Sequence, residues 1–260
     1  MPTHPRIVNE ALEQLNSLNI ITSRGERFCF VDIDNKAIIF TCERNLQFLC
    51  SNARNILADG TFYISPKHFN QVYTIQTYTT LGYVQVAFHL LLSKTISAYE
   101  CMWKRIRDLC SDDFNPETII LDSEVTAHNA FKKVYPNITI KGCSFHLSQT
   151  WYRKILDLGL HSEYTNPNSE VGKFLKYMFG LKYVPPCRVG DAFVELHSIS
   201  PNHNQLTRFL DYVLENYVSE DAKFSPKLWA SVPTDNNQNN KWGGIVPSSF
   251  ETTILQTSSL

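Results

Sequence analysis

The stretch Ala58 to Ile75, ADGTFYISPKHFNQVYTI, decides how the fold of this chain is interpreted. The apolar, β-branched and aromatic residues on either side of Ser65-Pro66 are typical of two half-buried strands. Asp59 and Gly60 interrupt the first of these strands. The aspartate is either a turn residue that caps backbone amides or an acid at the end of a sheet strand that holds a metal ion. An isolated Asp-Gly pair is more often a turn, so the metal interpretation requires a second acid elsewhere.

The composition describes a globular chain without a strong overall charge. Its 260 residues are 43% hydrophobic and 12% aromatic, and the formal net charge is -1. This length allows one elaborated domain, or a core with a smaller domain. No apolar run approaches the ~20 residues that cross a bilayer, and the first residues lack the apolar core of a secretory signal. The seven cysteines form no paired CxxC array, which suits a reducing compartment. We therefore expect an intracellular protein without membrane contact.

Hydrophobic periodicity predicts strands first and helices later. Residues 27–33 and 36–41 flank Asp34-Asn35, which indicates a hairpin. Further strands are expected from Ile56, at Gln71–Tyr78, at Val84–Leu92, at ETIILDSE and at ITIKGCSF, and helices at ERNLQFLCSNA, from Ser97, at TAHNAFKKVYP and from His146. From residue 56 the order is strand, strand, strand, helix, strand, helix, strand, helix, which is typical of a mixed α/β sheet. Residues 169–217 have helical spacing only.

This organisation predicts four segments. Residues 1–50 form an N-terminal hairpin and helix, and residues 51–160 form the core. Residues 161–225 form an all-α insertion after the last core strand. Residues 226–260 are rich in Asn, Ser, Pro and Gly, and we expect an irregular tail there.

A second acid, Asp122, also ends a predicted strand. Open α/β sheets place ligands at the carboxyl ends of their strands, so the strands of Asp59 and Asp122 are expected to be neighbours. Converging carboxylates repel one another unless a cation neutralises them, and hard oxygen ligands favour Mg²⁺ or Mn²⁺. Such a centre suits phosphodiester cleavage or strand transfer. Glu124 is expected to cap the helix that begins near Thr126.

Several motifs together resemble one family. DGTFYISP, FNQVYTI, LLLS before AYECMW, IILDSEVTAHNAFKKVYP and GCSFHLSQTWYRKILDLGL occur in the order found in the transposase domain of Mutator-like elements (MULE), over roughly residues 40–229. The resemblance implies a ribonuclease H-like mixed sheet with flanking helices, and metal-dependent cutting and joining of DNA. It also implies an acidic triad in which Asp59 and Asp122 are the catalytic and metal-binding acids. Gly60 would leave room for close approach to the metal.

Cys143 and His146 match the Cys-x-x-His motif of the family. Cys143 is either a small buried residue or part of the site, and His146 either stabilises the helix start or contacts a phosphate or a metal-bound water. A zinc site is not expected, because no second ligand pair has suitable spacing. Arg153 and Lys154 follow on the same predicted helix and are candidates for phosphate contacts.

The third acid of the family has no counterpart at its expected position. The family carries a glutamate three residues after an Asn-Asn pair, whereas this chain has Asn240 after Asn237 and Gly243 after Asn240. Glu251 and Glu215 are the remaining candidates. We therefore expect a truncated or decayed copy that binds Mg²⁺ or Mn²⁺ weakly and does not cut DNA above background.

Two classes of function follow. The first is a transposase catalytic domain that acts on transposon ends in the nucleus, and we expect a homo-oligomer as its working assembly. The second is a non-enzymatic, transposase-derived factor that binds DNA or protein. The presence of a third acid near Asp59 and Asp122 distinguishes them.

Overall fold

The computed structural model describes residues 5–33, 37–61, 65–79, 82–110, 114–122 and 124–231. The chain forms two compact units that divide between Ile140 and Lys141. Each unit is described by itself below. The four segments expected from the sequence stay a prediction.

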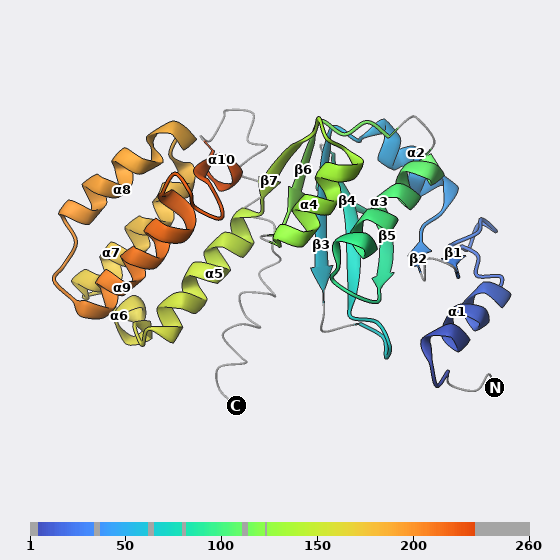
Figure 1. Ribbon diagram of the computed structural model, residues 1–260, viewed down its shortest axis with the longest axis horizontal. Helices are drawn as coiled ribbons and strands as arrows, with labels where there is room; N and C mark the ends of the chain where they lie inside the picture. The colour runs from blue at the N-terminus through green and yellow to red at the C-terminus, as the bar shows by residue number, and fades with distance from the viewer. Residues whose placement is uncertain are drawn as a thin grey trace. The chain divides into compact units, whose positions relative to one another are not determined.

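Seven strands within the described residues form one mixed sheet (Figure 1). Their order in space is β1-β2-β5-β4-β3-β6-β7. The strands span Cys29–Asp32 (β1), Ala37–Phe40 (β2), Asn55–Thr61 (β3), Gln71–Thr79 (β4), Gly82–Leu91 (β5), Thr118–Leu121 (β6) and Thr139–Gly142 (β7).

The pairing pattern changes at β3. Strands β1, β2, β5, β4 and β3 pair antiparallel with their neighbours, whereas β3 and β6 pair parallel. Parallel neighbours need a crossover, and β4, β5 and helix α3 (Ile96–Cys110) lie between β3 and β6 along the chain. The alternating order of strands and helices predicted from residue 56 is confirmed.

Helices cover both faces of the sheet. Helices α2 (Glu43–Ser51), α3 and α4 (Val125–Val134) bury their apolar sides in the largest core cluster with β3, β4, β5 and β6. Figure 1 shows α3 and α4 in front of the strands. Helix α1 (Val8–Ser17) contributes Leu12 to a smaller cluster with β1, β2, Val72 and Leu90. The sequence pattern did not predict α1.

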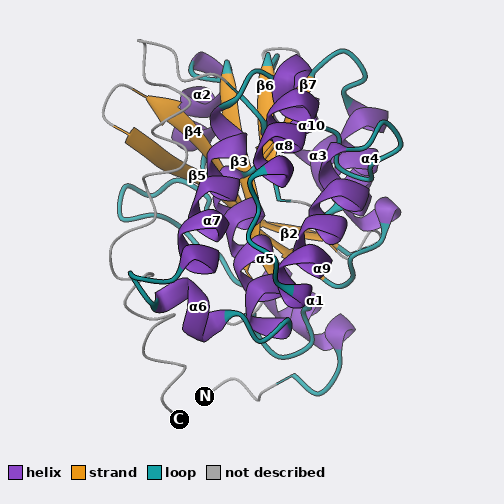
Figure 2. Ribbon diagram, turned by 90° about the vertical axis from the view of Figure 1, so that its left-hand side faces the viewer, coloured by secondary structure: helices purple, strands orange, loops and turns teal. Residues whose placement is uncertain are grey.

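Beyond β7, the described residues form helices and connecting loops (Figure 2). The aromatic rings of Phe209, Tyr217 and Trp229 contact Trp151 at the centre of the second core. The helical character predicted for residues 169–217 is confirmed. The elements are α5 (Ser144–Asp157), α6 (His161–Thr165), α7 (Glu170–Met178), α8 (Val189–Ser198), α9 (Asn204–Val213) and α10 (Pro226–Trp229), with 3₁₀ turns at Phe179–Tyr183 and Pro186–Arg188 and a π-helical turn at Leu214–Val218.

Some expectations lie outside the described residues. These are the Asp34-Asn35 turn and the tail from residue 232, which includes Asn240, Gly243 and Glu251. The strands on either side of that turn do pair, with Asp32 opposite Ala37. Among the described helices, none has the length and apolar character that a membrane crossing requires.

Candidate metal centre

Asp59 and Asp122 lie at corresponding positions on two neighbouring strands. The parallel pairing of β3 and β6 ends with Ala58 opposite Leu121, and each acid is the next residue along the chain. Asp59 lies within β3, and Asp122 directly follows the last residue of β6. Ala58 and Leu121 are fully buried in the core. Because successive side chains along a strand alternate between faces, both acids leave that core face in the same direction. The register of the sheet therefore brings the two carboxylates together.

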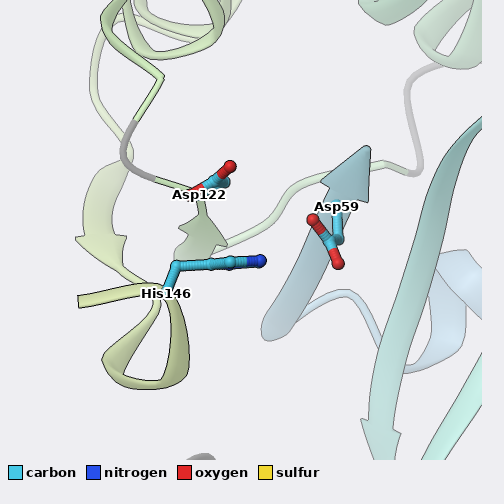
Figure 3. Close-up of side chains that lie close together, drawn as sticks. All are labelled: Asp59, Asp122 and His146. Carbon is cyan, nitrogen blue, oxygen red and sulfur yellow. The ribbon is translucent and has the colours of Figure 1, made fainter. Parts of the chain in front are cut away.

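The carboxylates form a cluster with His146. One ligand atom from each of Asp59, Asp122 and His146 lies within 4.8 Å of the other two. Figure 3 shows the imidazole of His146 extending toward Asp59, with Asp122 beside it. One carboxylate oxygen of Asp59 and Nδ1 of His146 are inaccessible to solvent. Two carboxylates at this separation are suitable ligands for a divalent cation.

The position of His146 follows from the strand that precedes it. Strand β7 lies beside β6 in the sheet and ends at Gly142. Helix α5 begins two residues later, and His146 is its third residue. Cys143 occupies the capping position of this helix, is half-buried, and makes no side-chain capping hydrogen bond. In the described part of the chain, the cluster of potential ligands does not include Cys143. The role of Cys143 stays a prediction.

The main-chain carbonyls of both acids accept hydrogen bonds from neighbouring side chains. Thr74 on β4 donates its hydroxyl to the carbonyl of Asp59 at 3.2 Å. Nε2 of His128 on α4 lies 2.6 Å from the carbonyl of Asp122. Burial lowers the pKa of His128, although the hydrogen bond to Asp122 opposes this shift. A carbonyl can only accept, so a ring N–H of His128 is the donor.

Gly60 leaves room for a neighbouring side chain. A Cβ atom at this position would lie 2.5 Å from Oε1 of Gln71 and 3.3 Å from the Tyr73 ring. We expected that Gly60 leaves space for close approach to a metal. The nearest atoms belong to Gln71 and Tyr73 on β4, and the room for a metal stays a prediction.

The capping role predicted for Glu124 is wrong. Glu124 does precede the first residue of α4, but its side chain makes no capping hydrogen bond. Its carboxylate accepts a hydrogen bond from the Tyr99 hydroxyl at 3.0 Å and lies 3.7 Å from Nζ of Lys94. The carboxylate therefore contacts Tyr99 of α3 and Lys94 rather than the backbone amides of α4.

Burial next to the acids raises the pKa of two tyrosines. Burial is the largest cause for both Tyr73 and Tyr99. The charges of Glu124 and Asp122 raise both pKa values further, and Asp59 adds to the shift of Tyr73. Both hydroxyls therefore keep their protons near neutral pH, and Tyr99 acts as a hydrogen-bond donor.

The remaining predicted residues lie in the second unit or outside the described residues. Arg153 is exposed on α5. Nζ of Lys154 lies 4.9 Å from the centre of the Tyr212 ring, so this cation has a partner within its own unit. Glu215 belongs to the π-helical turn and is not one of the three clustered residues. Glu251 is not among the described residues. Phosphate contacts by Arg153 and Lys154 stay a prediction.

A family model matches the central segment of the chain. Residues 55–150 match the family model of the MULE transposase domain. This range contains Asp59, Asp122 and His146. The resemblance predicted from the sequence motifs is thus confirmed for these residues.

The solved structures that match the chain include a viral intasome. The structure is the simian T-cell lymphotropic virus intasome in complex with PP2A regulatory subunit B56 gamma, determined by cryo-EM. The identity is 13% and the TM-score 0.24, and the match covers 69% of this chain and 55% of that chain. The chain thus spans little more than half the length of that relative. No curated protein matches the chain.

Proposed function

We propose that residues 55–150 form the catalytic domain of a MULE-type transposase, with a ribonuclease H-like fold and a divalent cation held by Asp59 and Asp122. One observation carries this proposal. Asp59 lies within β3 and Asp122 directly follows the parallel strand β6, and their carboxylate oxygens lie within 4.8 Å of each other. Two carboxylates held this close repel each other in the absence of a cation. The match of residues 55–150 to the MULE transposase domain supplies the family context.

The ligand set fits a divalent cation. Carboxylate oxygens are the preferred ligands of Mg²⁺ and Mn²⁺. A bound cation would polarise a phosphodiester oxygen and lower the pKa of an attacking water or hydroxyl. The protein residues bind this cation and set its position, while Thr74 and His128 restrain the backbone of the two acids.

The substrate of this domain is DNA, and the proposed location is the nucleus. The acids and the family match support a DNA substrate. The proposed DNA is a transposon end, and Arg153 and Lys154 are proposed phosphate contacts. A homo-oligomer is the proposed working assembly.

A second candidate is a non-enzymatic descendant of the transposase. The sequence favours it, because Asn240 and Gly243 stand where the family places its third acid. A site that lacks a carboxylate holds a cation less tightly and orients the attacking group less well. The chain would then bind Mn²⁺ and DNA without cutting.

A plasmid-nicking assay in Mn²⁺ separates the two candidates. We expect the unmodified chain to nick supercoiled DNA no faster than background. Asn240→Glu restores a glutamate three residues after Asn237 and should raise the rate, on the order of 100-fold if the missing acid is the main defect. Asn240→Gln is the matched control, since it has a similar size and no charge.

The outcomes exclude different parts of the proposal. Nicking by Asn240→Glu should disappear when Asp59→Asn or Asp122→Asn is added. Nicking that survives these additions would show that the two acids are not the catalytic centre. Manganese-dependent nicking by the unmodified chain, lost in Asp59→Asn, would refute the role assigned to the missing glutamate and would favour Glu251 or Glu215 as the third acid.

A further inference from the structure

A chain of buried polar side chains links the segments that carry the two acids. Gln71 on β4 donates from Nε2 to the Tyr99 hydroxyl at 2.6 Å, and this hydroxyl donates to Oε1 of Glu124 at 3.0 Å. At one end, Gln71 packs against Gly60, the residue after Asp59. At the other end, Glu124 lies two residues after Asp122 and directly before α4. The chain therefore runs from the backbone beside one acid to the backbone beside the other.

Stability alone does not account for these polar residues. Gln71 and Tyr99 are fully buried, and Tyr99 belongs to the apolar cluster under α3 and α4. Oε1 of Gln71 is buried and has no hydrogen-bond partner among the residues that the structure describes. Burying a polar atom without a partner is unfavourable, and apolar side chains of similar shape avoid this penalty. The sequence nevertheless places a glutamine and a tyrosine here, which indicates a role other than core packing.

Helix α4 also contacts the backbone of Asp122 directly. His128, one turn into α4, binds the carbonyl of Asp122. Lys94 lies 3.7 Å from Oε2 of Glu124, the oxygen that Tyr99 does not use. Three side chains thus fix the start of α4. These are Tyr99 on α3, Lys94 in the segment before α3, and His128 on α4 itself. A shift of this start would carry Asp122 with it.

We propose that Gln71, Tyr99 and Glu124 are positioning residues that fix the separation of the Asp59 and Asp122 carboxylates around a divalent cation. This inference rests on the proposed function, because it assigns the cation to those acids. Metal ligands must be held within about 0.5 Å of the required geometry. Side chains that orient ligands from outside the coordination sphere typically contribute about 10- to 100-fold to metal affinity. The Tyr99 hydroxyl is the centre of the chain because it both accepts and donates.

The test is a calorimetric titration of the full chain with MnCl₂. Tyr99→Phe removes one hydroxyl and leaves the ring in place, so both hydrogen bonds disappear. We expect Mn²⁺ affinity to fall about 10-fold. Tyr135→Phe is the matched control. Its hydroxyl is buried in the same apolar cluster and has no hydrogen-bond partner among the described residues. Its removal should leave the affinity unchanged.

A second pair of variants distinguishes position from charge. Glu124 is only half-buried, so the fold tolerates its replacement more readily. Glu124→Gln keeps an oxygen that accepts from Tyr99, and we expect it to retain the wild-type affinity. Glu124→Ala removes the acceptor and should lower the affinity about 10-fold. Equal losses in both variants would show that Glu124 acts through its charge, which overturns the positioning role.

The controls separate this inference from the proposed function. If the unmodified chain shows no Mn²⁺ binding that depends on Asp59, both proposals fail. If that binding is present and Tyr99→Phe equals Tyr135→Phe, only the positioning role fails. If Tyr99→Phe does not fold, as judged by circular dichroism, the Glu124 pair decides the outcome.

Discussion

His89 is a buried base that links the stability of the first unit to pH. It lies on β5 between Ile39 and Tyr73 of the two neighbouring strands and is 1% exposed. Neither ring nitrogen has a hydrogen-bond partner within the described part of the chain. Burial lowers the pKa of His89 to about 3. In the unfolded chain His89 therefore becomes protonated near pH 6.5, whereas in the folded chain it stays neutral until about pH 3.

We predict that His89 weakens the protein in mild acid. A group whose pKa is lowered by folding stabilises the protein above its unfolded pKa, and this contribution is lost as the pH falls toward the folded pKa. Between pH 6.5 and pH 4.5 the loss is about 2 to 3 kcal/mol. His89→Leu should remove this part of the pH dependence, as measured by urea unfolding at both pH values. His197→Leu, at an exposed position, should keep it. An unchanged pH dependence in His89→Leu would contradict the prediction.

Individual residues differ in how far the sequence reveals them. Asp59 and Asp122 could be predicted to lie close together because each follows an apolar run. The register of the two paired strands then places them side by side. The roles of Gly60 and Glu124 could not be predicted, because their partners, Gln71 and Tyr99, lie on other elements. His128 has no distinguishing local pattern either. Its bond to Asp122 arises only when α4 folds against the end of β6.

Two helical glycines show how packing decides the effect of one methyl group. A Cβ atom on Gly172 of α7 would lie 2.0 Å from the carbonyl oxygen of Glu163, a backbone atom of α6. Gly190 of α8 has nothing within 4 Å of such an atom and is exposed. Neither residue has a positive φ angle. The two positions therefore differ in their surroundings rather than in backbone conformation.

We predict opposite effects for alanine at these positions. Gly172→Ala should destabilise the second unit by about 1 to 3 kcal/mol or more, because the clash involves backbone that cannot rotate away. Gly190→Ala should be neutral or stabilising by up to about 1 kcal/mol, as alanine favours a helix over glycine. The midpoint of urea unfolding measures both. A wild-type midpoint in Gly172→Ala would show that α6 and α7 do not approach this closely.

At the scale of elements, sustained periodicity was the reliable signal. Helix α3 repeats buried residues at Tyr99, Met102, Trp103 and Ile106, and the sequence predicted it. Helix α1 buries only Ala11 and Leu12, so its short apolar side gave too weak a pattern. Strand pairing also requires information from distant segments, because the parallel contact of β3 with β6 joins residues separated by β4, β5 and α3.

For the whole molecule, the match to a transposase domain covers residues 55–150. This range spans the strands that bear both acids and the first turns of α5. The described residues to either side add α1, the hairpin β1-β2 and the helices of the second unit. The central claim concerns the matched range alone, namely that its two acids bind a divalent cation.

The most direct test of this claim is calorimetric titration of Mn²⁺ into the full chain and three aspartate variants. We predict saturable binding to the unmodified chain and loss of that binding in Asp59→Asn and Asp122→Asn, since each removes a carboxylate ligand. Asp157→Asn, at an exposed position at the end of α5, should bind as the unmodified chain does. Equal binding by all four proteins, or no saturable binding by any of them, would contradict the assignment of a metal site to Asp59 and Asp122.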